Sequence, residues 1–214
     1  MHELNRLLNG ILGGNSPQPK DVKHTFKGRQ YTVNGHHDTF RQKVYRGEDA
    51  AFTNWTLLDD GDFEAAKRFC NKVLKSATWL RIRKQHGMVK ETCPMQNRGT
   101  FRFSDGRGTN RAKGGGGWLN LPRWCRTKHI LLHEIAHNLV GASKGHHWPF
   151  CRAYIDLVAV FISKADAQRL ERELKKAGAK TRPPKQYSEE TMAKLRQRGH
   201  ELAAARKKKQ EEGK

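Results

Sequence analysis

The sequence predicts an α+β domain in which a small, mostly antiparallel sheet packs on helices. Residues 62–74 repeat apolar side chains at helical spacing, and residues 127–140 are apolar on nearly every side. Residues 78–83 and 100–103 alternate apolar with polar side chains, as half-buried strands do. A length of 214 residues suffices for one such core with extensions.

The chain is predicted to have three parts. Residues 1–37 include a Gly- and Pro-containing stretch at 13–19 that cannot continue a helix, so we interpret them as a loosely structured N-terminal arm. Residues 38–177 hold most of the aromatic side chains and form the predicted domain. Residues 178–214 are highly charged and end in the basic run 206–209, which predicts a C-terminal tail that is a marginal helix or disordered.

The elements of the domain follow from these patterns in chain order. The first helix, at residues 62–74, begins behind a cap at Asp60 or Asp62. The stretches 78–83 and 100–103 supply two strands. Residues 118–122 supply a third, and Pro122 predicts that it lies at the end or on the edge of the sheet. Three further helices are predicted at about residues 127–140, ending near Gly141, at 148–163 and at 165–177.

The charge of the chain predicts an acidic partner. Its 42 lysines and arginines against 21 acidic residues give a net charge of +21 at pH 7. Basic residues are dense between residues 81 and 128. This balance favours DNA or a nucleic-acid-bound protein as a partner; the alternative is a merely solvated basic surface, and no base-reading motif is present.

The remaining composition predicts a soluble, cytoplasmic protein. No apolar run approaches the roughly 18 residues of a membrane span, so no membrane partner is expected. The N-terminus lacks a signal-peptide pattern. The four cysteines (Cys70, Cys93, Cys125 and Cys151) contain no Cys-x-x-Cys pair, which predicts reduced thiols.

A metal-binding pattern lies in the helix predicted at residues 127–140. His133 and His137 are four residues apart, so both rings project from one helix face and can hold one metal ion. Glu134 lies beside them and can take a proton from bound water. Buried imidazoles and a carboxylate are costly unless a partner satisfies them, and a zinc ion with its water does so; the alternative is a hydrogen-bonded structural cluster.

A third ligand is expected downstream. Catalytic zinc usually has three protein ligands and one open position. Either His146 or His147 can complete the site, since both directly precede the next predicted helix. His129 lies one turn before His133, and we assign it a surface or supporting role because three ligands in a row on one helix would crowd a tetrahedral centre.

The pattern His133-Glu134-x-x-His137 followed by Gly145-His146-x-x-x-Phe150 resembles the SprT/Spartan-like zincins. That resemblance implies a zincin-like metallopeptidase core and His146 as the third zinc ligand. The chain is also similar, over roughly residues 38–177, to an actinobacterial and phage group of metallohydrolases assigned by inference. The segments that carry this likeness are 38–52, 131–137 and 150–158. The Cys-rich zinc ribbon of the eukaryotic Spartan proteins is missing, so DNA affinity would come from basic surface.

The same resemblance implies how a substrate binds. In zincins the strand before the metal helix, here Trp118, Leu119 and Asn120, would be the edge that pairs with an extended peptide; the alternative is that these are ordinary core residues. We therefore expect a zinc-dependent metallopeptidase that acts on protein or peptide substrates, including DNA-associated proteins, with Glu134 as general base. The alternative is a nucleic-acid-binding or structural protein with a non-catalytic zinc site. The sequence predicts no oligomeric state.

Overall fold

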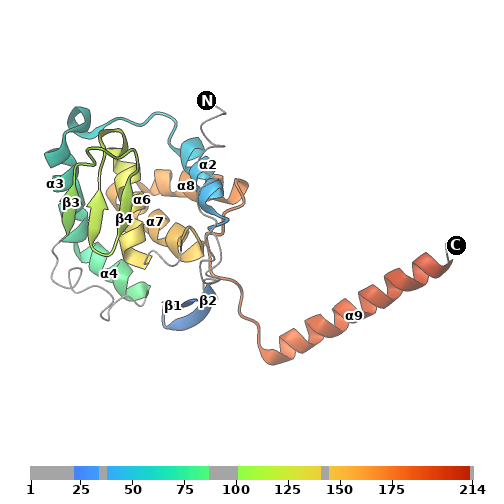
Figure 1. Cartoon of the computed structure of the whole chain (residues 1–214). Coiled ribbons are helices and arrows are strands. Elements are labelled where there is room, and N and C mark those ends of the chain that lie inside the picture. The colour runs from blue at the N-terminus through green and yellow to red at the C-terminus, as the bar shows by residue number, and fades with distance from the viewer. Residues whose placement is uncertain (1–21, 34–37, 87–100, 141–144, 213–214) are drawn as a thin grey trace, which may run out of the picture. The chain divides into compact units, whose positions relative to one another are not determined.

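The computed structural model describes residues 22–33, 38–86, 101–140 and 145–212. The chain divides into two compact units, residues 1–182 and residues 183–214. Among the described residues the first unit contains six α-helices and five short strands, and the second contains one helix (Figure 1). The predicted α+β class is confirmed.

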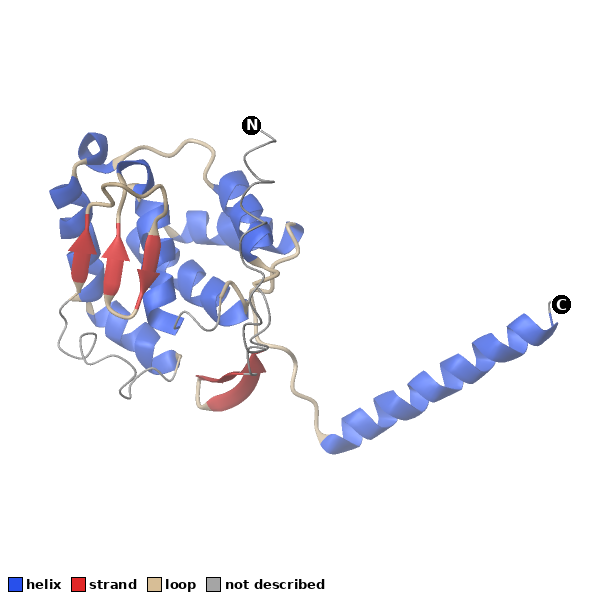
Figure 2. Cartoon of the chain, in the orientation of Figure 1, coloured by secondary structure: helices blue, strands red, loops and turns tan. Residues whose placement is uncertain are grey.

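The sheet that accompanies the helices is mixed, and the prediction of a mostly antiparallel sheet is wrong. It has the order β3-β5-β4, with β3 at Arg102–Ser104, β4 at Lys113–Gly115 and β5 at Trp118–Asn120 (Figure 2). Strand β5 pairs parallel with β3 and antiparallel with β4. It is thus the central strand, which corrects the expected edge position of the Trp118 segment.

A tight glycine turn joins β4 to β5 and explains their antiparallel pairing. Gly116 and Gly117 have φ values of +60° and +81°, which non-glycine residues rarely adopt, and they return the chain from β4 directly into β5. Pro122 lies beyond the strand, where it precedes a short 3₁₀ helix at Arg123–Cys125. The proline therefore disrupts no strand pairing.

The stretch predicted as a strand at residues 78–83 is part of helix α4, Ala77–Gln85. Ser76 caps this helix, since its hydroxyl accepts a hydrogen bond from the Trp79 backbone N–H at 3.1 Å. Trp79 and Ile82 are buried one helical turn apart, whereas Leu80 is exposed. Helical spacing, and not the apparent alternation, determines which side chains enter the core.

The other predicted helices are confirmed with small shifts at their ends. Helix α3 spans Phe63–Leu74, and the Asp62 carboxylate caps it by accepting from the Ala65 backbone N–H at 2.6 Å. Ser163 caps α8 in the same way. Gly141, the expected end of the motif helix, lies outside the described residues. The three later helices are α6 at Lys128–Val140, α7 at Trp148–Phe161 and α8 at Lys164–Lys176.

One further helix, α2 at Arg41–Ala51, was not expected from the apolar pattern. It packs closely on α8, because a Cβ atom at Gly47 would come within 2.8 Å of the Leu174 backbone. Helix α8 in turn contacts α7, and α7 contacts α6. This series of contacts brings α2 into the same packed unit as the motif helix.

Helix α6 lies between the sheet and α7. Its apolar side chains are fully buried, among them Leu131, Leu132 and Leu139, except Ile130, which is partly buried. On the sheet side, a Cβ atom at Gly114 of β4 would overlap the carbonyl oxygen of Glu134. Only glycine allows β4 to approach the α6 backbone this closely.

Residues 22–33 of the predicted arm form an antiparallel hairpin of β1, Val22–Phe26, and β2, Arg29–Val33. Its turn contacts α4, since the Lys27 backbone N–H donates to the Gln85 carbonyl oxygen at 2.7 Å. The rest of the predicted arm lies outside the described residues. In the second unit, the tail contains helix α9, Glu189–Glu212.

The described residues also bear on the predictions about membrane spans and cysteines. No helix of the described residues is both long and apolar enough to cross a membrane. Cys70, Cys125 and Cys151 are buried free thiols, and burial raises the pKa of each. Cys93 lies outside the described residues.

Candidate metal centre

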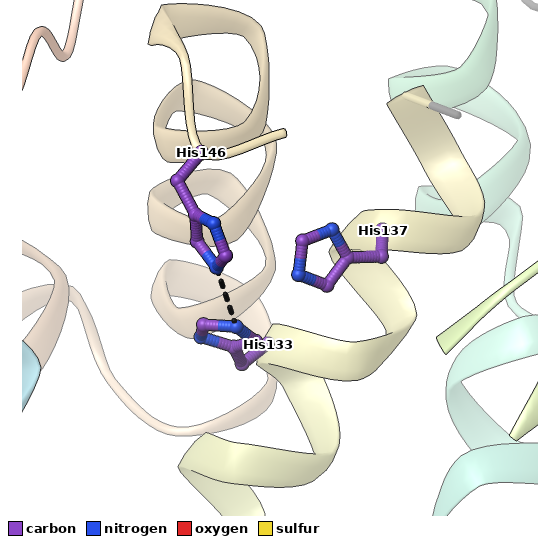
Figure 3. A group of neighbouring side chains, drawn as sticks. All are labelled: His133, His137 and His146. Carbon is purple, nitrogen blue, oxygen red and sulfur yellow. Dashed lines mark hydrogen bonds between the residues drawn. The ribbon is translucent and has the colours of Figure 1, made fainter. Parts of the chain in front are cut away.

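Three histidines converge at one point in the first unit. His133 and His137 project from the same face of α6, and His146 reaches them from the residues just before α7 (Figure 3). One ligand nitrogen from each ring lies within 4.8 Å of the others. Among the described residues, these are the His, Cys and acidic groups whose arrangement fits a metal ion.

The distance between two of the rings matches a tetrahedral metal ion. The Nε2 atoms of His133 and His146 lie 3.2 Å apart. Two imidazoles bound to zinc at roughly 2.0–2.1 Å with tetrahedral angles would place these atoms about 3.3 Å apart. This pair of nitrogens is therefore spaced as two ligands of one metal ion would be, and the third, from His137, lies within 4.8 Å of both.

Asp38 positions His146. Its carboxylate accepts hydrogen bonds from the His146 backbone N–H at 3.2 Å and from the His146 Nδ1–H. Gly145 makes this approach possible, since its φ is +44° and a side chain there would come within 3.0 Å of the Asp38 carboxyl carbon. The contact leaves Nε2 of His146 facing the other two rings.

Glu48 lies within ion-pair distance of His133. Its Oε2 lies 3.2 Å from His133 Nδ1, and its Oε1 accepts a hydrogen bond from the Tyr154 hydroxyl at 2.6 Å. Burial alone would raise the pKa of Glu48, but the neighbouring His133 and these hydrogen bonds hold it below its usual value. A carboxylate behind a histidine ligand fixes the ring and strengthens it as a donor.

Phe150 forms an apolar base beneath the three imidazoles. Its ring centroid lies 4.8 Å from that of His133, 4.4 Å from His137 and 4.7 Å from His146. Burial lowers the pKa of His137 well below its ordinary value, and burial also lowers that of His146. Neutral imidazoles are the form that binds a metal ion. Burial also acts to lower the pKa of His133, but the neighbouring carboxylates, Glu48 foremost, together outweigh burial and raise that pKa above its ordinary value.

Glu134 is buried beside the three histidines. Desolvation raises its pKa to about 7, an effect that the Glu48 charge increases and that the His133 charge and the Gly114 backbone N–H partly offset. A carboxyl group with a pKa near neutrality can both accept and return a proton. The group thus has the titration behaviour of a general base.

The centre opens into a cavity of about 870 Å³. All three histidines and Glu134 line it. Four large aromatic side chains that are partly exposed to solvent line it as well: Tyr45, Trp55, Trp118 and Trp124. A peptide-sized ligand thus has access to the centre and apolar surfaces to contact.

Of the two neighbouring histidines, His146 lies with His133 and His137, and His147 lies outside this group. His147 is the cap residue of α7, and its ring packs against Phe40 at a centroid distance of 5.1 Å. His129 is buried, not on the surface: its ring stacks on Phe52, and its Nδ1 lies 3.2 Å from the Thr127 hydroxyl.

The three residues expected to bind substrate have different positions. Trp118 is 39% exposed and lines the cavity. Leu119 and Asn120 are buried, and the Asn120 amide donates a hydrogen bond to the Arg111 carbonyl oxygen at 2.7 Å. Of the three, only Trp118 is open to a ligand.

Three site residues on or beside α2 were not identified from the sequence: Asp38, Tyr45 and Glu48. All three lie in the segment 38–52 that carries part of the family resemblance. Tyr45 and Glu48 are three residues apart, which places them on one helix face. This polar spacing is the signal that the sequence offers, and apolar periodicity does not include it.

No protein-family model, curated protein or solved structure matches this chain.

Proposed function

We propose that this chain is a zinc-dependent metallopeptidase with His133, His137 and His146 as zinc ligands and Glu134 as general base. One observation carries the proposal: three converging imidazoles and the buried carboxyl group of Glu134 line the same solvent-accessible cavity. A purely structural zinc site would be closed by a fourth protein ligand, and none is found among the described residues. The resemblance to SprT-like zincins supports the same assignment.

The residues have complementary roles in hydrolysis. Zinc, when bound, supplies a Lewis acid that polarises a carbonyl group and makes water acidic enough to ionise near neutral pH. Glu134 accepts the proton of the attacking water at a carboxylate oxygen and later returns it to the departing amine. Asp38 and Glu48 hold His146 and His133 in place throughout.

Strand β4 is the better candidate for substrate pairing. Among the described residues β4 pairs with β5 alone, whereas β5 is paired on both sides, so β4 is an edge strand of this sheet. It also packs on α6 beside Glu134. An extended peptide added to β4 would lie along the cavity, with main-chain hydrogen bonds that tolerate many sequences.

DNA-associated proteins are the proposed substrates. The net charge of +21 favours a nucleic-acid-bound partner. Arg41, Arg111 and Lys113 line the cavity itself, so basic side chains reach the centre. A substrate attached to DNA would be concentrated near the centre by this charge.

Zinc content provides the first test. Purified wild-type protein should contain about one zinc per chain, and His133→Ala, His137→Ala and His146→Ala should each lose most of it. His147→Ala is the matched control, because it removes the adjacent imidazole and should retain the metal. A folded wild-type protein that binds no zinc after reconstitution would contradict the proposal.

Hydrolysis provides the second test. Glu134→Gln should keep its zinc and lose on the order of 10²- to 10⁴-fold in the rate of casein cleavage, since it removes the base and leaves the ligands intact. The measurement is release of labelled peptides, with and without single- and double-stranded DNA. Full activity of Glu134→Gln would exclude Glu134 as the base.

A further inference from the structure

We propose that Tyr45 is a further catalytic residue, whose phenol donates a hydrogen bond to the substrate carbonyl oxygen as that oxygen becomes negatively charged. This inference rests on the proposed peptidase function. It assigns a donor for the developing charge, a role that neither the histidines nor Glu134 can fill while they bind metal and accept the water proton.

Helix α2 holds Tyr45 at the centre. Asp38 and Glu48 contact two different histidines, His146 and His133, and Tyr45 lies between these two contacts along the chain. The chain is therefore held at the centre on both sides of Tyr45, by Asp38 before α2 begins and by Glu48 within α2. The Tyr45 backbone cannot shift away without loss of one of the two contacts.

The ring of Tyr45 lies against the same two histidines. Its centroid is 5.8 Å from that of His133 and 5.4 Å from that of His146. The three histidine rings are separated from one another by 4.8 to 5.2 Å. Tyr45 is thus almost as close to two of the ligands as the ligands are to each other, on the side that opens into the cavity.

The hydroxyl of Tyr45 is available to a ligand. The residue is 44% exposed and lines the cavity. Within the described part of the chain, no protein group is found that accepts a hydrogen bond from this hydroxyl; the Tyr154 hydroxyl, in contrast, donates to Glu48. A phenol keeps its proton at neutral pH, so Tyr45 is a donor under working conditions.

Water oxygen forms a bond to the carbonyl carbon, its proton passes to Glu134, and the carbonyl π pair moves onto the carbonyl oxygen, where the Tyr45 O–H donates. The pair then returns as the C–N bond breaks. The amine nitrogen keeps the C–N pair and takes the proton from Glu134, which gives an acid and an amine.

Anion binding tests Tyr45 without any need for turnover. Cobalt-loaded full-length protein is titrated with inorganic phosphate, whose extra oxygens can accept from Tyr45, and with azide, which has no oxygen atom. The cobalt absorption spectrum reports binding. Tyr45→Phe should require about tenfold more phosphate for half-saturation, as expected for one lost hydrogen bond to a charged group, and should bind azide like wild type. Tyr187→Phe, an exposed tyrosine outside the cavity lining, is the matched control.

Peptide cleavage is the second readout. Tyr45→Phe should lower kcat by on the order of 10- to 100-fold with KM and zinc affinity nearly unchanged, because the bond forms only as charge develops. Equal phosphate affinity in wild type and Tyr45→Phe, or no phosphate-dependent spectral change in wild type, overturns the assignment of Tyr45. A third outcome is that Tyr45→Phe binds phosphate tenfold more weakly than wild type while the wild-type protein cleaves no peptide. This result overturns both the peptidase function and the catalytic role of Tyr45, but shows that the hydroxyl contacts an anion at the metal.

Discussion

At the residue scale, one proton on Glu134 links the stability of the fold to the chemistry of the site. Burial raises its pKa from an ordinary value to about 7. At pH values between 4.5 and about 7, Glu134 holds a proton in the folded, metal-free protein but has lost it in most unfolded chains. The free energy of unfolding therefore falls as pH rises through this window.

We predict that Glu134→Gln stabilises the metal-free protein at high pH. The shift from 4.5 to about 7 corresponds to about 3 kcal/mol. Glu134→Gln should thus gain up to about 3 kcal/mol of unfolding free energy relative to wild type at pH 8, and show little of this gain at pH 4.5. Urea denaturation of the metal-free proteins at the two pH values measures the difference.

Glu64→Gln is the control for this measurement, because Glu64 is exposed in the first turn of α3. Its effect should stay within about 0.5 kcal/mol at both pH values. A difference between wild type and Glu134→Gln that does not change with pH would contradict the effect of burial on Glu134.

The sequence allowed prediction of the residues whose roles depend on local spacing. His133, Glu134 and His137 lie within one helical segment, so their common face follows from the geometry of the helix. Asp38 and Glu48 could not be found this way. They lie 108 and 85 residues before the histidines that they contact, and only the tertiary fold brings them together.

At the element scale, α2 and the residues just before it support the candidate metal centre through Asp38 and Glu48. Its packing on α8 at Gly47 fixes its position, and Asp38 and Glu48 transmit that position to His146 and His133. Loss of either carboxylate should leave the ligands present but poorly oriented.

We therefore predict that Asp38→Asn and Glu48→Gln each weaken zinc binding by roughly 10- to 100-fold. Competition with a chromophoric chelator measures the affinity, and circular dichroism checks the fold. Asp49→Asn is the matched control, since it removes a cavity-lining carboxylate from the same helix that contacts none of the three ligands. Wild-type affinity in both variants would show that α2 does not orient the ligands.

Element prediction succeeded where the pattern was long and failed where it was short. Helices α6, α7 and α8 each show 13 or 14 residues of consistent spacing or burial. The six residues 78–83 fit both a strand and a helix, and the Ser76 cap decided the outcome. The order of strands in the sheet depends on which segment pairs with which, and no local signal contains that information.

At the scale of the whole molecule, the charge is distributed over both units. Residues 183–214 contain nine lysines and arginines against five glutamates, so most of the basic excess belongs to residues 1–182. The proposal of DNA-associated substrates thus does not depend on the tail alone.

We predict that removal of residues 183–214 leaves the metal centre intact and weakens DNA binding only in part. The shortened chain should keep its zinc stoichiometry and thermal midpoint, because the centre and the core lie in the first unit. Its DNA affinity should depend less steeply on salt than that of the full chain, since fewer phosphates are neutralised.

Fluorescence anisotropy of a labelled duplex, measured across salt concentrations, gives the salt dependence of DNA affinity for both chains. Zinc loss on truncation would show that the units depend on each other, and full-chain DNA binding that is insensitive to salt would contradict the electrostatic proposal.

Gly114 sets how closely β4 approaches the motif helix α6. Because only a hydrogen atom separates this residue from the Glu134 carbonyl oxygen, the height of β4 above the motif helix is set by backbone contact and not by side-chain packing. Any larger residue at position 114 would therefore have to move β4 away from α6, and this would change the distance between the strand and Glu134.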